Sequence, residues 1–145
     1  MMANWYECKI RYEKTIDGKT KKVNESYLVD GLTYTEAETR ILETLCQYIS
    51  GEYTITNIKR SRIIEIFTSE VDAYDRWFNC KINIITLDEE KGVEKKTPQL
   101  MLVHADTIDT ALARLREGLK DTLYDYTIVS ISESPILDYF PYKVD

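Results

Sequence analysis

Two stretches of the chain resemble each other closely, Trp5-Tyr6-Glu7-Cys8-Lys9-Ile10 and Trp77-Phe78-Asn79-Cys80-Lys81-Ile82. Further matches follow at offsets of 72 to 74 residues. Each copy continues with a glycine in a turn, a pair of lysines, a helix-like segment and a β-rich segment. Matches that stay in register over this length are typical of an internal repeat. We therefore interpret the chain as two repeats, residues 4–67 and 76–142, joined by a linker at 68–75.

Apolar and polar side chains alternate along the first strand of each repeat, which is typical of a half-buried β-strand. Tyr6, Cys8 and Ile10 would face the core, and Trp5 and Lys9 would face the opposite side. The second repeat sorts its residues in the same way. The sequence therefore predicts a sheet with one apolar face and one polar face in each repeat.

A hairpin and then a helix follow the first strand. Asp17-Gly18 is a hairpin signal, and the polar residues around it predict a loop longer than two residues. Thr33 and Glu36 have the spacing of a capping box at a helix start. The apolar stripe of this helix comprises Ala37, Ile41, Leu45 and Ile49, with Gly51 just past its end.

The second repeat predicts the same elements. Its helix would be capped by Asp106 or Thr107, and we expect breaks in the closing β-rich runs near Ser61 and Pro135. The fold class is then α+β: an internal duplication of a ββαβ(β) unit with a mainly antiparallel sheet, one helix per repeat and a pseudo-twofold axis. The helices would cover one face of a shared sheet, or each would cover its own sheet. The stripe of the second helix comprises Ile108, Ala111, Leu112, Leu115 and Leu119.

Length and charge exclude several classes of protein. A chain of 145 residues suits a single domain, residues 1–145. Its net charge of −6 argues against binding duplex DNA through a basic surface, but not against single strands, where stacking supplies part of the affinity. No apolar run approaches the roughly 20 residues of a membrane span, and no signal peptide is recognisable at the start. We expect a cytoplasmic protein without membrane contact.

Few residues suit catalysis or a metal ion. His104 is the only histidine, and we interpret it as a solvated or capping residue. Cys8, Cys46 and Cys80 have no metal-binding or redox spacing, and we interpret all three as buried structural thiols. The sequence therefore assigns no catalytic residue, no metal ligand and no cofactor.

A hydrolase is a third, less favoured hypothesis. Glu65 and Asp138 occupy matching positions in the closing runs, and Glu7 with Lys9 is similar to the end of a metal-dependent nuclease site. Carboxylates on strands more often face solvent, and Asn79 stands where Glu7 would be repeated. An enzyme is therefore uncertain, and a protein without catalytic activity is favoured.

The polar face of the first strand is the most informative feature of each repeat. It carries a tryptophan and a lysine four residues apart. Bases stack on such rings for about 1–3 kcal/mol each, and a nearby lysine can meet phosphate. Alternatively, each tryptophan packs against the other repeat or a second subunit. The candidate ligand-binding residues are Trp5, Lys9, Arg11, Lys21, Lys22, Trp77, Lys81, Lys95 and Lys96.

Several segments together resemble a known family. The segments are Asn4 to Tyr12, Tyr27 to Asp30, Thr35 to Glu38, Arg76 to Lys81, Ser130 to Ser134 and Asp138 to Tyr142. They are similar to domain of unknown function 4494, a family of gut Bacteroidota and their bacteriophages. The resemblance implies that the protein works in the cytoplasm of a bacterium or its phage. It assigns no activity and no functional residue to the chain.

Two hypotheses of different classes follow for the function. The first is a non-enzymatic, homo-oligomeric binding protein whose tryptophan–lysine faces contact single-stranded nucleic acid or a nucleotide. The second is a protein–protein interaction or assembly module in which the same faces bury against a protein partner. Added salt discriminates between them, because nucleic-acid binding weakens steeply with salt.

Overall fold

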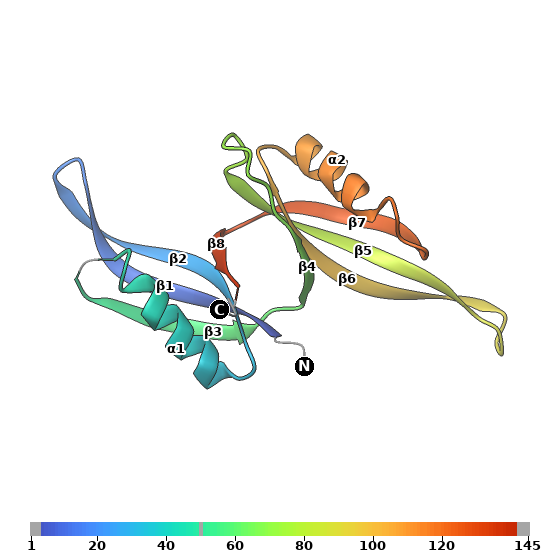
Figure 1. Ribbon diagram of the computed structural model, residues 1–145, viewed down its shortest axis with the longest axis horizontal. Coiled ribbons are helices and arrows are strands. Elements are labelled where there is room, and N and C mark those ends of the chain that lie inside the picture. Colours follow the sequence, from blue (N-terminus) through green and yellow to red (C-terminus); the bar gives the residue numbers. More distant parts are fainter. Residues whose placement is uncertain (1–3, 50, 142–145) are drawn as a thin grey trace. The chain divides into compact units, whose positions relative to one another are not determined.

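The computed structural model describes residues 4–49 and 51–141, whose helices and strands form two compact units (Figure 1). Unit 1 comprises Met1–Ser61 and Pro135–Asp145, and unit 2 comprises Arg62–Ser134. Within the described residues the fold is α+β, as predicted, with two helices and two four-stranded sheets. The elements in chain order are β1 (Asn4–Ile16), β2 (Lys19–Gly31), α1 (Tyr34–Leu45), β3 (Tyr53–Arg60), β4 (Ile63–Phe67), β5 (Arg76–Asp88), β6 (Val93–Ala105), α2 (Ile108–Leu119), β7 (Asp125–Ser134) and β8 (Ile136–Phe140).

Unit 1 is a sheet in the order β3-β1-β2-β8 with α1 packed on one face. β1 runs antiparallel to β2 and β3, whereas β8 pairs with β2 in parallel. The predicted alternation along β1 is confirmed, because Tyr6, Cys8 and Ile10 are buried beneath α1. The helix and β2 contribute the rest of this buried core, Val29, Ala37, Ile41, Leu45 and Ile49.

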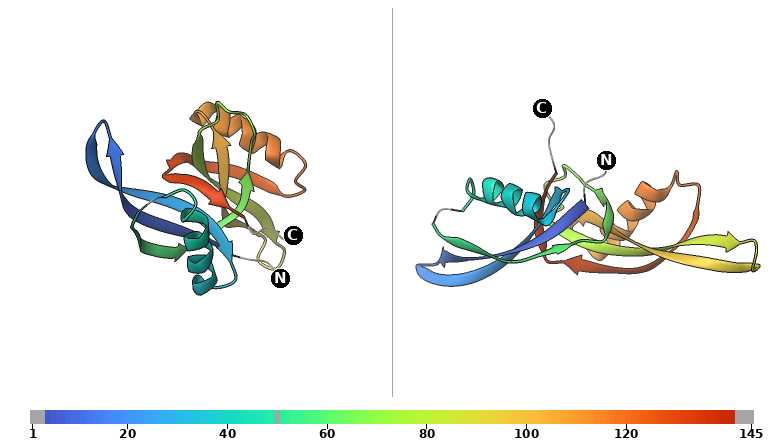
Figure 2. Two further views of the ribbon diagram at one scale, coloured as in Figure 1. Left: turned by 60° about the vertical axis from the view of Figure 1, so that its left-hand side comes forward. Right: turned by 90° about the horizontal axis from the view of Figure 1, so that it is seen from below.

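Unit 2 has the same arrangement, with strands in the order β4-β6-β5-β7 and α2 on one face. β5 takes the place of β1, and Phe78, Cys80 and Ile82 are the buried residues of that strand. Figure 2 shows each helix lying against one face of its own sheet, which is one of the two predicted arrangements. Among residues 4–49 and 51–141, no helix lies on the opposite face of either sheet, which we call the open face.

Each sheet receives its fourth strand from a distant part of the chain. β4 follows β3 after only Ser61 and Arg62, yet it pairs with β6 in unit 2. β8 follows β7 after Pro135 and pairs with β2 in unit 1. The predicted breaks near Ser61 and Pro135 are thus confirmed, and each one passes a strand to the other unit. We call β4 and β8 the exchanged strands.

The first hairpin is tighter than the sequence predicted. β1 ends at Ile16 and β2 begins at Lys19, so Asp17 and Gly18 alone form the turn, with φ angles of 53° and 74°. Positive φ at both positions is typical of a type I′ turn, which matches the twist of paired strands. The prediction of a longer loop was wrong because polar residues continue the strand pairing beyond the part of the sheet that the helix covers.

Both helices begin where the sequence predicted. The Thr33 hydroxyl accepts a hydrogen bond from the Glu36 backbone N–H at 3.1 Å, and Thr107, rather than Asp106, caps α2. α1 ends at Leu45, earlier than the stripe to Ile49 indicated. The prediction for Ile108 was wrong: it begins α2 but is 55% exposed, and the buried residues of this helix are Ala111, Leu115 and Leu119. Among the described residues, neither helix has the length and apolar character that a membrane crossing requires.

Candidate functional site

The open face of unit 1 brings together polar side chains from three strands. Along β1, alternation places Trp5, Glu7, Lys9 and Arg11 on this face, as predicted. The strand register places Asn24 of β2 opposite Arg11. β2 and β3 also contribute Lys22, Ser26, Thr54, Asn57 and Lys59 to the open face.

Three exposed cations on this face are free of carboxylate partners. Among the described residues, no carboxylate lies within ion-pair distance of Lys9, Arg11 or Lys22. The Arg11 Nε donates a hydrogen bond to the Asn24 Oδ1 at 3.4 Å, across the pair of strands β1 and β2. Unpaired surface cations of this kind can meet an anionic ligand without first breaking an ion pair.

The Glu7 carboxylate on the same face is paired. Its Oε2 lies 3.2 Å from the Lys59 Nζ of the neighbouring strand β3. The negative charge of Glu7 is therefore balanced within the sheet, and the face retains the positive charge of the other cations. Lys59 was missed in the sequence analysis, although it lies one strand away and directly opposite Glu7.

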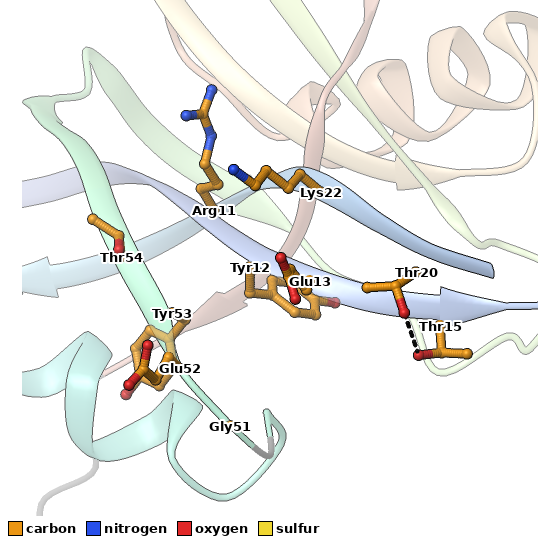
Figure 3. A pocket seen from close by; sticks show the side chains of 10 residues that line it. All are labelled: Arg11, Tyr12, Glu13, Thr15, Thr20, Lys22, Gly51, Glu52, Tyr53 and Thr54. Atoms are coloured by element: carbon orange, nitrogen blue, oxygen red, sulfur yellow. Dashed lines mark hydrogen bonds between the residues drawn. The ribbon is translucent and has the colours of Figure 1, made fainter. Parts of the chain in front are cut away.

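Two grooves open along these residues. A groove of about 350 Å³ is lined by Glu7, Lys9, Asn24, Ser26, Asn57, Lys59 and Pro135. A second groove, of about 640 Å³, lies where β3 begins and includes Arg11, Lys22, Tyr12, Tyr53 and Thr54. Figure 3 shows the Arg11 and Lys22 side chains reaching to the same side of the hairpin, away from Tyr53 and Glu52. Glu13 and Glu52 also line the second groove, so the two grooves combine cations with carboxylate, amide and hydroxyl groups.

The two lysines of each neighbouring pair point to opposite faces of their hairpin. Lys21 lies opposite Lys14, and Lys22 lies opposite Glu13, so the two neighbours project to opposite faces of the hairpin. Lys95 and Lys96 are separated in the same way in unit 2, where they lie opposite Thr86 and Ile85. Only Lys22 and Lys96 share the face of the tryptophan and lysine in their own unit.

The two tryptophans have different surroundings. Trp5 is half-buried, and its ring meets the Tyr139 ring edge-on with centroids 6.3 Å apart. Trp77 is only 4% exposed and stacks on His104 at 4.3 Å with an interplanar angle of 10°. Trp5 therefore keeps part of its surface exposed, whereas Trp77 is almost fully buried.

The open face of unit 2 is poorer in cations. Asn79, Lys81 and Asn83 take the places of Glu7, Lys9 and Arg11 along the strand. Ser132 lies opposite Asn79, at the position that Lys59 occupies in unit 1.

The carboxylates considered for hydrolysis belong to different units or are already engaged. Glu65 is on β4 in unit 2, and Asp138 is on β8 in unit 1, where its Oδ1 accepts from the Tyr139 N–H at 2.8 Å. Glu7 is bound to Lys59. Among the described residues, no three His, Cys, Asp or Glu side chains gather closely enough to hold a metal ion.

The three cysteine thiols differ in burial, and burial raises the pKa of two of them. Cys8 and Cys80 are buried, as predicted, and burial raises the pKa of Cys80 to about 11. Burial, with smaller effects of Glu7 and Glu38, raises the pKa of Cys8 to about 12. The prediction for Cys46 was wrong: it is exposed, because it caps the C-terminal end of α1 next to Leu45 and lies off the buried stripe of the helix.

A tyrosine pair beside the larger groove shares one carboxylate. The Tyr27 hydroxyl donates to the Glu25 Oε1 at 3.4 Å. A hydrogen bond to Glu25, followed by burial and the carboxylate charge, raises the pKa of Tyr12 to about 12. Both hydroxyls are therefore directed to the Glu25 carboxylate.

Comparison with known proteins places the chain in a family. The model of the domain of unknown function DUF4494 matches residues 4–142. No curated protein and no solved structure matches the chain. Because the match covers nearly the whole sequence, the chain belongs to the DUF4494 family.

Proposed function

We propose that the protein is a non-enzymatic binding protein that holds single-stranded nucleic acid or a nucleotide on the open face of unit 1. The observation that carries the proposal is the set of exposed cations without carboxylate partners, Lys9, Arg11 and Lys22, along two polar grooves. Lysine and arginine meet phosphate oxygens, and arginine can do so with two parallel hydrogen bonds. Asn24 and Asn57 add amide donors and acceptors for sugar or base edges.

The distribution of charge supports this assignment. Unit 1 has 10 lysine and arginine residues against 11 aspartate and glutamate residues, a net charge of −1. Unit 2 has 9 against 14, a net charge of −5. The acidic character of the chain therefore belongs mainly to unit 2, and the local field on unit 1 depends on which side chains face the ligand.

A protein–protein interaction or assembly module is the second candidate. The burial of Trp77 and its stack on His104 count against base stacking in unit 2, because a ring that is already packed offers no surface to a base. In this case the open faces would bind a protein, and association would tolerate added salt.

Three broader features complete the proposal. The two units share strand order and helix position, which supports an origin by internal duplication. We also propose that the protein is a homo-oligomer and that it works in the cytoplasm of a bacterium or its phage.

The test is the fluorescence anisotropy of a dye-labelled single-stranded oligonucleotide titrated with the full-length protein at low and then moderate salt. We expect saturable binding that weakens with salt, because bound cations displace counterions from the strand. Replacing Lys9, Arg11 and Lys22 together with alanine should abolish it without lowering the melting temperature. The absence of saturable binding, or binding that ignores salt, would refute the proposal.

A further inference from the structure

We infer that unit 1 alone contacts nucleic acid, and that its ligand is an extended single strand rather than a free nucleotide. This inference rests on the proposed function. Its basis is a linear row of cations on the open face of unit 1, which we call the cation row: Lys59, Lys9, Arg11 and Lys22.

The cation row follows the direction of β1. Lys9 and Arg11 are two residues apart on one strand, and at about 3.4 Å per residue their Cα atoms are about 7 Å apart. Lys59 lies opposite Glu7, two residues before Lys9, and Lys22 lies opposite Glu13, two residues after Arg11. The four cations thus extend over about 20 Å along β1, with one cation for every two residues of the strand.

A row of this length fits a polyanion with charges at regular intervals. One nucleotide would meet only one or two of the cations, and the others would contribute little to its binding. An extended strand can place a phosphate near each cation, so its affinity grows with every contact and carries a salt dependence set by their number. Lys59 is ion-paired with Glu7, so a phosphate at that end of the row has to compete with the Glu7 carboxylate, whereas Lys9, Arg11 and Lys22 have no ion pair among the described residues. Glu13 lies opposite Lys22, and Glu52 lines the groove at the same end.

Unit 2 lacks half of the cation row. Asn83 stands in the place of Arg11, and Ser132 stands in the place of Lys59, so only Lys81 and Lys96 remain. Together with the closed stack of Trp77 on His104, these differences leave unit 2 without a continuous cationic surface.

The two units supply matched variants for the test. Lys9→Ala removes a member of the cation row, and Lys81→Ala removes the lysine at the equivalent position in unit 2. Arg11→Asn introduces the residue that unit 2 carries, and Arg11→Lys retains the charge as a conservative control. These side chains are exposed or half-exposed, and a melting curve for each variant verifies that it folds.

The probe is a labelled oligothymidine of about 12 nucleotides, a length within the range of sites on single-strand-binding domains. We expect Lys9→Ala and Arg11→Asn to weaken binding about three- to tenfold each and to flatten the dependence of log K on log salt by about 0.7 per lost phosphate contact. Lys81→Ala should change Kd less than twofold, and Arg11→Lys should recover most of the affinity. An excess of thymidine monophosphate should displace little of the bound strand.

The outcomes separate the inference from the proposed function. If Lys9→Ala and Lys81→Ala weaken binding equally, both units bind and the assignment to unit 1 is wrong, while the proposed function stands. If thymidine monophosphate displaces the strand at a comparable concentration of phosphate, the ligand is a nucleotide and the extended-strand inference is wrong. If the wild-type protein shows no saturable binding, the inference fails together with the proposed function, and a protein partner becomes the alternative.

Discussion

Arg114 in α2 donates a hydrogen bond to the carbonyl oxygen of Phe67, the last residue of the exchanged strand β4, at 3.5 Å. It also reaches the carbonyl oxygen of Thr68 at 2.7 Å and that of His104. In unit 1, Arg40 of α1 makes the corresponding bond to Phe140, the last residue of β8, at 3.5 Å. Each helix thus uses one arginine to hold the strand that the sheet receives from elsewhere in the chain.

Arg114→Ala should destabilise the protein by about 1–3 kcal/mol, because three backbone carbonyl groups lose a charged donor. Urea unfolding followed by circular dichroism measures the change. Arg116→Ala is the matched control, because Arg116 lies on the same helix and is exposed. Equal stability of the two variants would show that Arg114 does not hold β4.

Gly118→Ala should destabilise the protein although alanine is the better helix former. An added Cβ at this position would lie 2.6 Å from the Phe67 Cε1 of β4. The strain of about 1–3 kcal/mol outweighs a gain of about 1 kcal/mol in helix propensity. Thermal unfolding of Gly118→Ala and of Gly118→Ala with Phe67→Leu tests this. The second change makes room for the methyl group, so the double variant should be the more stable of the two.

A single thiol should react with a disulfide reagent in the native protein at neutral pH. Cys46 is exposed, whereas Cys8 and Cys80 are buried and burial holds the pKa of both thiols high. Absorbance of the released thiolate counts the reactive groups. Cys46→Ser should abolish the fast reaction, and all three thiols should react once the protein is unfolded in urea. Fast reaction in the Cys46→Ser variant would contradict the buried positions of the other two.

Stability should fall in alkali as the pH passes from 9 to about 12. The pKa of the Cys8 thiol rises from 9.0 in its unfolded reference to about 12, so the folded state retains a proton that the unfolded state has released. This contribution is fully present below pH 9 and is lost as the pH rises through the folded pKa. Urea midpoints across this interval measure the slope. Cys8→Ala should lower stability at neutral pH and show a shallower alkaline decline; an unchanged slope would rule out Cys8 as its source.

Local features were predictable because they depend on neighbouring residues. The alternation of Tyr6, Cys8 and Ile10 indicates the buried face, and the Thr33 and Thr107 caps mark both helix starts. The separation of Lys21 from Lys22 also follows from the period of two along a strand, which places neighbouring residues on opposite faces.

The exchange of β4 and β8 could not be predicted from the residues of those strands. Ile63 and Ile136 have the pattern of any short buried strand, and the choice of partner depends on which sheet edge lies within reach after the break. The stack of Trp77 on His104 is also non-local, because it joins residues on two strands through their register. Lys59 joins the open face for the same reason.

The exchanged strands have a consequence for a nicked chain. A single cut between residues 68 and 75 would leave an N-terminal fragment that still carries β4 and a C-terminal fragment that still carries β8. Each fragment would then keep one strand hydrogen-bonded within the sheet of the other, so the two fragments would remain associated without a covalent link. A protease that cuts this segment would cleave the polypeptide without separating its halves.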